Sequence, residues 1–194
     1  MDTCRIIPED WLGQLDFEGC YNAVRPVEVD VGCGKGGFLL ARAAAFPETN
    51  FLGIDRMLRR IRKIDNKVQR RGLDNVKLLR VDASYAISHM IPESSVSVYY
   101  VFFPDPWPKK RHKSQRFFDA LFLNALHRTL KPGGFIHAAT DHIPFFEEIE
   151  ALMENDCRFV RAETFVPLEN ERTEFERYYL RRTDIGRCSF FKNE

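Results

Sequence analysis

Five aspartates recur at the ends of apolar segments, and carboxylates gathered in this way can bind cations or hydrogen-bond donors. The spacing between them is about the length of one strand and one helix, and they are Asp30, Asp55, Asp82, Asp105 and Asp141. A single aspartate in such a place is most often the N-cap of the next helix. Because the carboxyl ends of parallel strands meet at one edge of a sheet, five of them predict a carboxylate-lined site there.

The glycine-rich turn GCGKGG, residues 32–37, supplies a second part of this site. It fits the pattern GxGxxG through Gly32, Gly34 and Gly37, and it lies between a strand-like segment and a helix-like one. Glycines there allow a nucleotide-like ligand to approach the backbone closely. Asp55 follows at about the offset expected for an acid that binds ribose hydroxyls. The turn and Asp55 alone would suit NAD as well as S-adenosyl-methionine.

The charge of the other acids favours the methyl donor. A dinucleotide brings a pyrophosphate to the glycine turn, and Asp30 beside that turn would repel it. S-adenosyl-methionine instead carries an ammonium and a sulfonium, which suit carboxylates at Asp30 and Asp105. Asp82 could accept a hydrogen bond from the adenine amino group. We therefore expect a methyltransferase rather than a hydride-transferring enzyme.

The segment PDPWPKKRH, residues 104–112, combines a stiff backbone with groups that bind nucleotides. Two prolines flank Asp105, fix backbone φ and limit the entropy lost on ordering the loop. Trp107 offers a face on which a base can stack, and Lys109, Lys110 and Arg111 offer contacts to phosphates. This combination favours a splayed-out nucleotide as the substrate.

Alternating strand and helix patterns position these residues. We expect strands at 27–32, 50–55, 76–82, 96–103 and 135–141, and helices at 37–46, 56–71, from 83 onward, 114–130 and 144–155, with KPGG at 131–134 as a turn. Two late segments, 158–166 and 177–184, the second with an extension at 188–191, predict an antiparallel pair with no helix between them. Such alternation indicates an α/β fold with an open, doubly wound, mostly parallel sheet. Residues 1–194 form one predicted domain, with 1–25 as a short lead-in.

Composition and charge point to a folded protein with a polyanionic partner. The net charge is +1, yet residues 56–71 hold eight basic residues and one acid, whereas acids gather in residues 145–156 and 168–176. Neither a signal peptide nor a membrane span is evident, so we expect a cytoplasmic protein. Five scattered cysteines suggest reduced thiols, and the histidines show no metal-ligand spacing, so no metal is expected.

Together these motifs resemble the bacterial tRNA (guanine-N7)-methyltransferase family. The resemblance runs from about residue 26 to residue 179 and rests on GCGKG, a strand ending in GID, a strand ending in DA, FPDPWPKKRH, a strand ending in TD, and TEFE at 173–176. It implies a Rossmann-like methyltransferase fold. It also implies transfer of a methyl group from S-adenosyl-methionine to N7 of guanine at position 46, in the variable loop of tRNA.

The resemblance assigns roles residue by residue. Asp105 is implied as the catalytic residue, and the implied cofactor-binding residues are Asp30, Gly32, Gly34, Asp55, Asp82, Ala83 and Asp105. The implied substrate-binding residues are Lys109, Asp141, Thr173, Glu174, Phe175 and Glu176. The family usually has Glu at the position of Asp30 and often at that of Asp55, so both carboxylates are one methylene shorter in this chain.

Guanine N7 carries a lone pair and no proton, so the expected reaction needs positioning and charge stabilisation rather than a general base. Three other functions remain open from the residues alone. They are methylation of an amino group on adenine or protein, RNA binding without catalysis, and NAD-dependent oxidation. We expect tRNA as the partner and a monomer or a homodimer.

Overall fold

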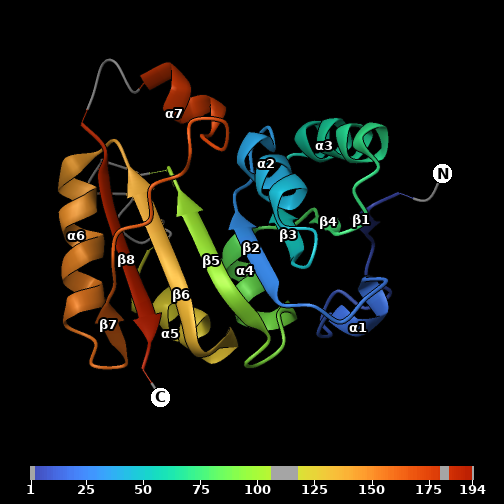
Figure 1. Cartoon of the computed structure of the whole chain (residues 1–194). Coiled ribbons are helices and arrows are strands. Elements are labelled where there is room, and N and C mark those ends of the chain that lie inside the picture. Colours follow the sequence, from blue (N-terminus) through green and yellow to red (C-terminus); the bar gives the residue numbers. More distant parts are fainter. Residues whose placement is uncertain (1–2, 106–117, 180–183, 194) are drawn as a thin grey trace.

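The computed structural model describes residues 3–105, 118–179 and 184–193, and these form an eight-stranded sheet (Figure 1). The strand order is β1-β4-β3-β2-β5-β6-β8-β7. Strands β1 to β6 run parallel, and β8 is antiparallel to both β6 and β7. The prediction of a mostly parallel sheet with a C-terminal antiparallel pair is confirmed. The strands are β1 (Arg5–Ile6), β2 (Val27–Val31), β3 (Asn50–Ile54), β4 (Val76–Leu79), β5 (Val96–Phe102), β6 (Leu130–Thr140), β7 (Phe159–Arg161) and β8 (Gly186–Lys192).

Helices cover both faces of the sheet, as a doubly wound arrangement requires. One face packs against α2 (Gly37–Ala45) and α3 (Leu58–Arg71). The other packs against the short helix α4 (Ala83–Tyr85) with the π-helix η1 (Ala86–Met90), and against α5 and α6. The remaining bounds are α1 (Phe17–Cys20), α5 (Ala120–Thr129), α6 (Ile143–Glu154) and α7 (Glu174–Tyr179).

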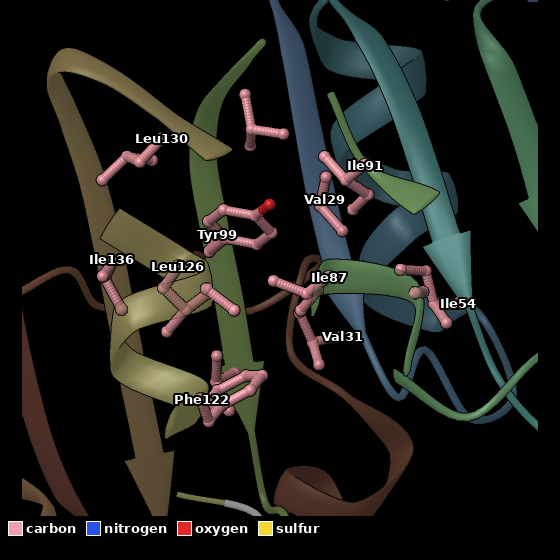
Figure 2. Packing of buried hydrophobic residues seen from close by; sticks show 14 of the residues in the cluster. Val29, Val31, Ile54, Ile87, Ile91, Tyr99, Phe122, Leu126, Leu130 and Ile136 are labelled. Carbon is pink, nitrogen blue, oxygen red and sulfur yellow. The ribbon is translucent and has the colours of Figure 1, made fainter. Parts of the chain in front are cut away.

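The larger part of the core lies between the middle strands and the layer formed by η1 and α5. Figure 2 shows Val29 of β2 and Tyr99 of β5 facing Ile87 and Leu126, which come from η1 and α5. Each of these four side chains is fully buried, at 0% exposure. Burial of such residues supplies roughly 1.5 to 3 kcal/mol each. The strand ends that carry the acids are therefore held on a rigid support.

The strand expected at 177–184 is wrong at its start, because helix α7 covers Glu174–Tyr179; residues 180–183 lie outside the described residues. The hydroxyl oxygen of Thr173 accepts a hydrogen bond from the backbone N–H of Glu176 at 3.0 Å, which is the N-terminal half of a capping box. This cap starts a helix that includes Tyr178 and Tyr179, the first residues of the aromatic run. The second strand of the antiparallel pair is therefore β8, and a helix does lie between the two strands.

Three smaller differences concern element ends. KPGG was expected as a turn, but it lies within β6, where the register against β5 is irregular between Val96 and Val98. Of the helix expected at 114–130, the described part is Ala120–Thr129, and residues 114–117 lie outside the described residues. Strand β1 was missed because two residues are too few to show a period.

Candidate active site

A pocket of about 820 Å³ lies at the carboxyl ends of β2, β3, β4 and β5. This is the place where open parallel sheets bind ligands. Polar and apolar groups both line it: Val31, Gly32, Ile54, Asp55, Arg56, Met57, Arg60, Val81, Asp82, Ala83, Ser84, Ser88, Phe102, Phe103, Pro104, Asp105, Asp119, Leu121 and Phe122. The pocket volume is large enough for a nucleoside that carries a substituent the size of an amino acid.

The structure brings three of the five expected acids into this pocket, namely Asp55, Asp82 and Asp105. Asp30 is 6% exposed and lies behind the pocket wall. It belongs to β2, and the two residues that follow it, Val31 and Gly32, line the pocket. Asp141 follows β6 directly, but it is not among the described residues that line the pocket. All five acids thus lie at or just after the carboxyl ends of parallel strands, and three of them line this pocket.

Asp55 connects the glycine turn to the start of α3. Its carboxylate, in a residue that is 5% exposed, accepts hydrogen bonds from the backbone N–H of Met57 at 2.7 Å and of Gly34 at 3.2 Å. Arg60 adds an ion pair at 3.1 Å. A carboxylate with three fixed donors keeps its orientation, and its remaining lone pairs can accept ligand hydroxyls.

Asp30 is a buried acid on the α2 side of β2. Burial, together with the negative charges of Asp55 and Glu174, raises the pKa of its carboxyl group to about 7. A cationic group bound at this wall would lower that pKa again and would stabilise the ionised form. Asp30 is thus suited to a ligand that carries a positive charge.

We expect Asp30→Asn to change how stability depends on pH. Because the pKa of Asp30 rises from 3.8 in the unfolded chain to about 7 in the folded protein, the folded protein holds an extra proton between about pH 4 and pH 7. The free energy of unfolding of the wild type should therefore fall as pH rises through that window, whereas Asn has no proton to lose.

Urea unfolding at pH 5, 6, 7 and 8 checks this expectation. Relative to wild type, Asp30→Asn should gain stability from pH 5 to pH 8. If the free energy of unfolding changed with pH in the same way for wild type and Asp30→Asn, a raised folded-state pKa of Asp30 would be excluded.

The positions in the turn that require glycine differ in part from those of the GxGxxG pattern. Gly32, Gly34 and Gly36 adopt positive φ values of 73°, 56° and 75°, a conformation that glycine adopts at no steric cost. Gly37 has no such φ, but a Cβ there would lie 2.8 Å from the Glu174 carboxylate. The turn is therefore shaped by Gly36, and α7 rests against it at Gly37.

Gly36→Ala should destabilise the protein by about 2 to 4 kcal/mol. A Cβ at this position would meet Ile64 of α3 at 2.8 Å, in addition to the cost of a positive φ in alanine. Gly72→Ala is the matched control, because φ there is 63° and nothing lies within 4 Å of the added Cβ. It should cost only about 1 kcal/mol in urea unfolding. Equal losses would mean that α3 moves freely enough to remove the clash.

Asp82 and Ala83 form the part of the pocket opposite the glycine turn. Asp82 is exposed, and its side chain caps α4 by accepting a hydrogen bond from the backbone N–H of Tyr85 at 3.2 Å. The N-cap role that a lone aspartate predicts is thus real here, yet the same residue faces the pocket. One carboxylate oxygen accepts the capping bond, which leaves the other for a ligand donor.

Asp105 stands at the exposed mouth of the pocket, two residues after a strained position. Phe103 has φ 54°, a left-handed value that is uncommon for a bulky side chain and costs about 1 to 3 kcal/mol. Its backbone N–H donates to the carbonyl of Ala139 at 2.7 Å, and its ring lies 4.8 Å from that of Phe175. The chain therefore leaves β5 in a direction set by β6 and α7, and that direction places Asp105.

The TEFE residues reach this region, but they differ in accessibility. Thr173 caps α7, Glu174 lies against the glycine turn, and Phe175 remains 40% exposed beside Phe103. Glu176 is 1% exposed and pairs with Arg187 at 2.5 Å and Arg172 at 3.7 Å. In this structure Glu176 holds α7 to β8. Lys109 lies outside the described residues, as do Trp107, Lys110 and Arg111.

A buried polar network that the sequence did not reveal holds the segment before α7. Arg42 of α2 pairs with Glu171 at 3.4 Å and with Glu28 at 3.7 Å, and it donates to the Tyr100 hydroxyl at 3.2 Å. Tyr100 in turn donates to Glu28 at 2.8 Å. Since these partners come from distant parts of the chain, only the fold shows that they position α7.

Among the pocket residues that were not assigned from the sequence, three carry polar or flexible side chains of interest: Asp119, Met57 and Arg60. Asp119 caps α5 by accepting from the N–H of Phe122 at 2.8 Å, and it had been placed inside a longer helix. Met57 and Arg60 line the pocket from the start of α3. The sequence did hold a signal for Met57 and Arg60, since both follow Asp55 within five residues. Residues that closely follow a strand-end acid lie at the same edge of the sheet.

Two features of the described residues concern alternative functions. They contain no group of three or more His, Cys, Asp or Glu side chains placed to hold a metal ion. None of the described helices has the length and apolar character that crossing a membrane requires.

Comparisons with known proteins show which family the chain resembles. A family model described as "Putative methyltransferase" matches residues 24–183. A tRNA (guanine-N(7)-)-methyltransferase of Halorhodospira halophila is 37% identical over 175 residues, which cover 88% of this chain and 76% of that protein. A protein of the same name from Nocardia farcinica is 37% identical over 138 residues, covering 71% of this chain and 51% of its own length.

Among solved structures, the 16S rRNA methyltransferase KamB superposes with a TM-score of 0.69 at 18% identity, covering 92% of this chain and 93% of that one. This likeness establishes the methyltransferase fold and nothing finer. The sequence match is the more specific result, since it spans most of both chains at 37% identity. The chain belongs to the tRNA (guanine-N7)-methyltransferase family.

Proposed function

We propose that this protein transfers a methyl group from S-adenosyl-methionine to N7 of guanine 46 in the variable loop of tRNA, acting as a single domain in the cytoplasm. The observation that carries the proposal is the pocket in which Asp55, Asp82 and Asp105 converge at the carboxyl ends of three strands. Membership in the family supplies the reaction class. The choice of tRNA as the substrate rests on the relatives, which are named tRNA (guanine-N(7)-)-methyltransferases.

The donor set of the pocket fits S-adenosyl-methionine. Asp55 offers fixed acceptors for ribose hydroxyls, and Asp82 with Ala83 offers an acceptor and a small side chain for the adenine edge. Asp30, behind Gly32, provides a carboxyl that a nearby ammonium would ionise. Gly34 adds a backbone that can lie close to the ligand because its φ is 56°. A pyrophosphate would meet these same acids with repulsion.

The bound cofactor would supply an electrophilic methyl on sulfur, whose bonding electron pair stays on sulfur as the guanine N7 lone pair forms the new bond. The protein needs no base for this step, because N7 carries no proton. Its own contribution is to hold the two reactants in line, which can supply roughly 7 to 11 kcal/mol. Asp105, at the pocket mouth, stabilises the positive charge that develops on the guanine ring.

The substrate base would be held between the mouth of the pocket and α7. Phe175, which is 40% exposed, offers a face for contact with the RNA, and Glu174 lies at the glycine turn nearby. Thr173 and Glu176 would act by holding α7 in place, the first as its cap and the second through Arg187. We place Asp141 and Lys109 in the same substrate surface on the resemblance alone.

The test is to incubate the purified protein with labelled S-adenosyl-methionine and two tRNA transcripts. One carries guanine at position 46 and the other carries adenine there, and both are digested to nucleosides for mass spectrometry. We expect 7-methylguanosine from the first transcript and none from the second. Methylation of both would place the target elsewhere in the tRNA, and methylated adenosine would indicate an amino-group methyltransferase instead.

A further inference from the structure

The exposed face of α3, outside the pocket, carries basic side chains and no exposed acid. Residues 56–71 contain eight basic residues, and their one acid, Asp65, is 5% exposed. Asp65 turns inward and binds the N-terminal segment through Thr3, Cys4 and Arg5. It therefore neutralises none of the outward-facing charge.

Helical spacing arranges this charge as one row. Arg59, Lys63, Asn66 and Arg70 follow one another at intervals of four, three and four residues, and all four are exposed. We call them the α3 ridge. Arg62 lies on one side of the ridge, and Lys67 and Arg71 lie on the other. At 1.5 Å per residue the ridge is about 17 Å long.

The arrangement works against the stability of the helix itself. Arg59 and Arg60 lie in the first turn, where the helix dipole favours acids, and no acid is present there. Arg59 and Lys63 are like charges four residues apart, as are Lys63 and Lys67, which costs a few tenths of a kcal/mol each. Among the described contacts of these eight basic residues, Arg60 alone forms an ion pair, with Asp55. A polyanion bound to this face would relieve that repulsion.

The ridge begins where the pocket ends. Arg56, Met57 and Arg60 line the pocket, and α3 leads away from it on the α2 side of the sheet (Figure 1). A strand of phosphates lying along the ridge would therefore reach the pocket mouth. An anionic membrane fits less well, because the apolar residues of α3, Ile61, Ile64 and Val68, are buried against the sheet and cannot insert into lipid.

We propose that the α3 ridge binds the sugar-phosphate backbone of the tRNA substrate at a distance from the methylated base. The inference rests on the proposed function for the identity of the RNA, but it concerns binding and not chemistry. The contacts are to phosphates, so they should add affinity with little dependence on base sequence.

The experiment compares wild type with a triple variant, Arg59→Gln, Lys63→Gln and Arg70→Gln. Glutamine keeps a high helix propensity, so α3 should remain folded. The dissociation constant for an unmodified tRNA transcript is measured from about 50 to 200 mM salt. We expect at least a tenfold rise at low salt and a salt slope smaller by about 2, since each phosphate contact contributes roughly 0.7 to 0.9.

Matched controls separate the ridge from general charge effects. Lys63→Gln and Lys131→Gln remove the same charge from exposed lysines, but Lys131 lies at the start of β6, at the opposite end of the sheet from the pocket. Only the first should weaken tRNA binding. The affinity of the triple variant for S-adenosyl-methionine should stay within about twofold of wild type, and its melting temperature should not fall.

An unchanged salt slope in the triple variant would overturn the proposal. So would a loss of binding to phosphatidylglycerol vesicles with tRNA binding retained, because the ridge would then serve a membrane. If wild type forms 7-methylguanosine but the slope is unchanged, the ridge alone is wrong. If the slope falls but wild type forms no 7-methylguanosine, the RNA surface stands and the proposed reaction fails.

Discussion

Asp105→Asn should lower the rate of methyl transfer to tRNA about 10² to 10³-fold, the usual effect of removing one group that stabilises charge in a transition state. The side chain stands at the pocket mouth after Pro104, in a direction fixed by the strained backbone at Phe103. Asparagine keeps its shape and one acceptor oxygen but removes the charge. Single-turnover rates measured with saturating tRNA and saturating S-adenosyl-methionine isolate the effect on the chemical step from any effect on cofactor binding.

Asp119→Asn provides a comparison within the same pocket. Asp119 also lines the pocket and is exposed, and asparagine can replace it as the N-cap of α5. We expect a much smaller loss of rate, about threefold, because the role of Asp119 is to cap α5, and asparagine can fill that role. Equal losses in the two variants would show that the overall negative potential of the pocket matters, and that Asp105 has no special role at the reacting base.

Asp55→Ala should raise the dissociation constant for S-adenosyl-methionine about 100-fold. The change removes the acceptors for the ribose hydroxyls and leaves two backbone donors, on Gly34 and Met57, without their partner. Arg60 also loses its ion pair beside the pocket. Hydrogen bonds to a charged group contribute roughly 1.5 to 3 kcal/mol, so two lost ligand bonds account for the expected effect.

Titration calorimetry with S-adenosyl-methionine and with its demethylated product measures this loss. Asp55→Asn is the graded control, because it keeps one oxygen acceptor and should weaken binding only about tenfold. Arg60→Gln tests the ion pair by itself and leaves the carboxylate in place. If Asp55→Ala bound the cofactor within threefold of wild type, Asp55 would be a support of the glycine turn and not a ligand-binding residue.

Most of the fold could be predicted because its signals are local. Short apolar runs that end in Asp55 or Asp82 indicate buried strands, and each helix-like segment between them shows apolar residues at three- or four-residue spacing. The strand predicted at 177–184 failed although a local signal against it existed. Thr173 and Glu176 have the spacing of a capping box, but the aromatic run after them was given more weight.

Within the site, the sequence indicated which residues lie near the carboxyl edge but not which ones face the pocket. Asp55, Asp82 and Asp105 line the pocket, Asp30 lies behind it and Asp141 is not among its lining residues, although all five lie at or near the end of an apolar segment. Direction and burial depend on neighbours from other strands and helices, as the influence of Glu174 on the Asp30 carboxyl shows.

Local patterns in the sequence sufficed to predict the class of fold and the carboxyl edge of the sheet at which the pocket lies, because strand period, glycine turns and strand-end acids involve neighbouring residues. Tertiary structure alone decided the accessibility of each acid and the placement of α7. It did so through contacts between distant segments, such as Arg42 with Glu171 and Phe103 with Phe175. Such contacts leave no periodic pattern, because their energy arises only when the folded chain brings both partners together.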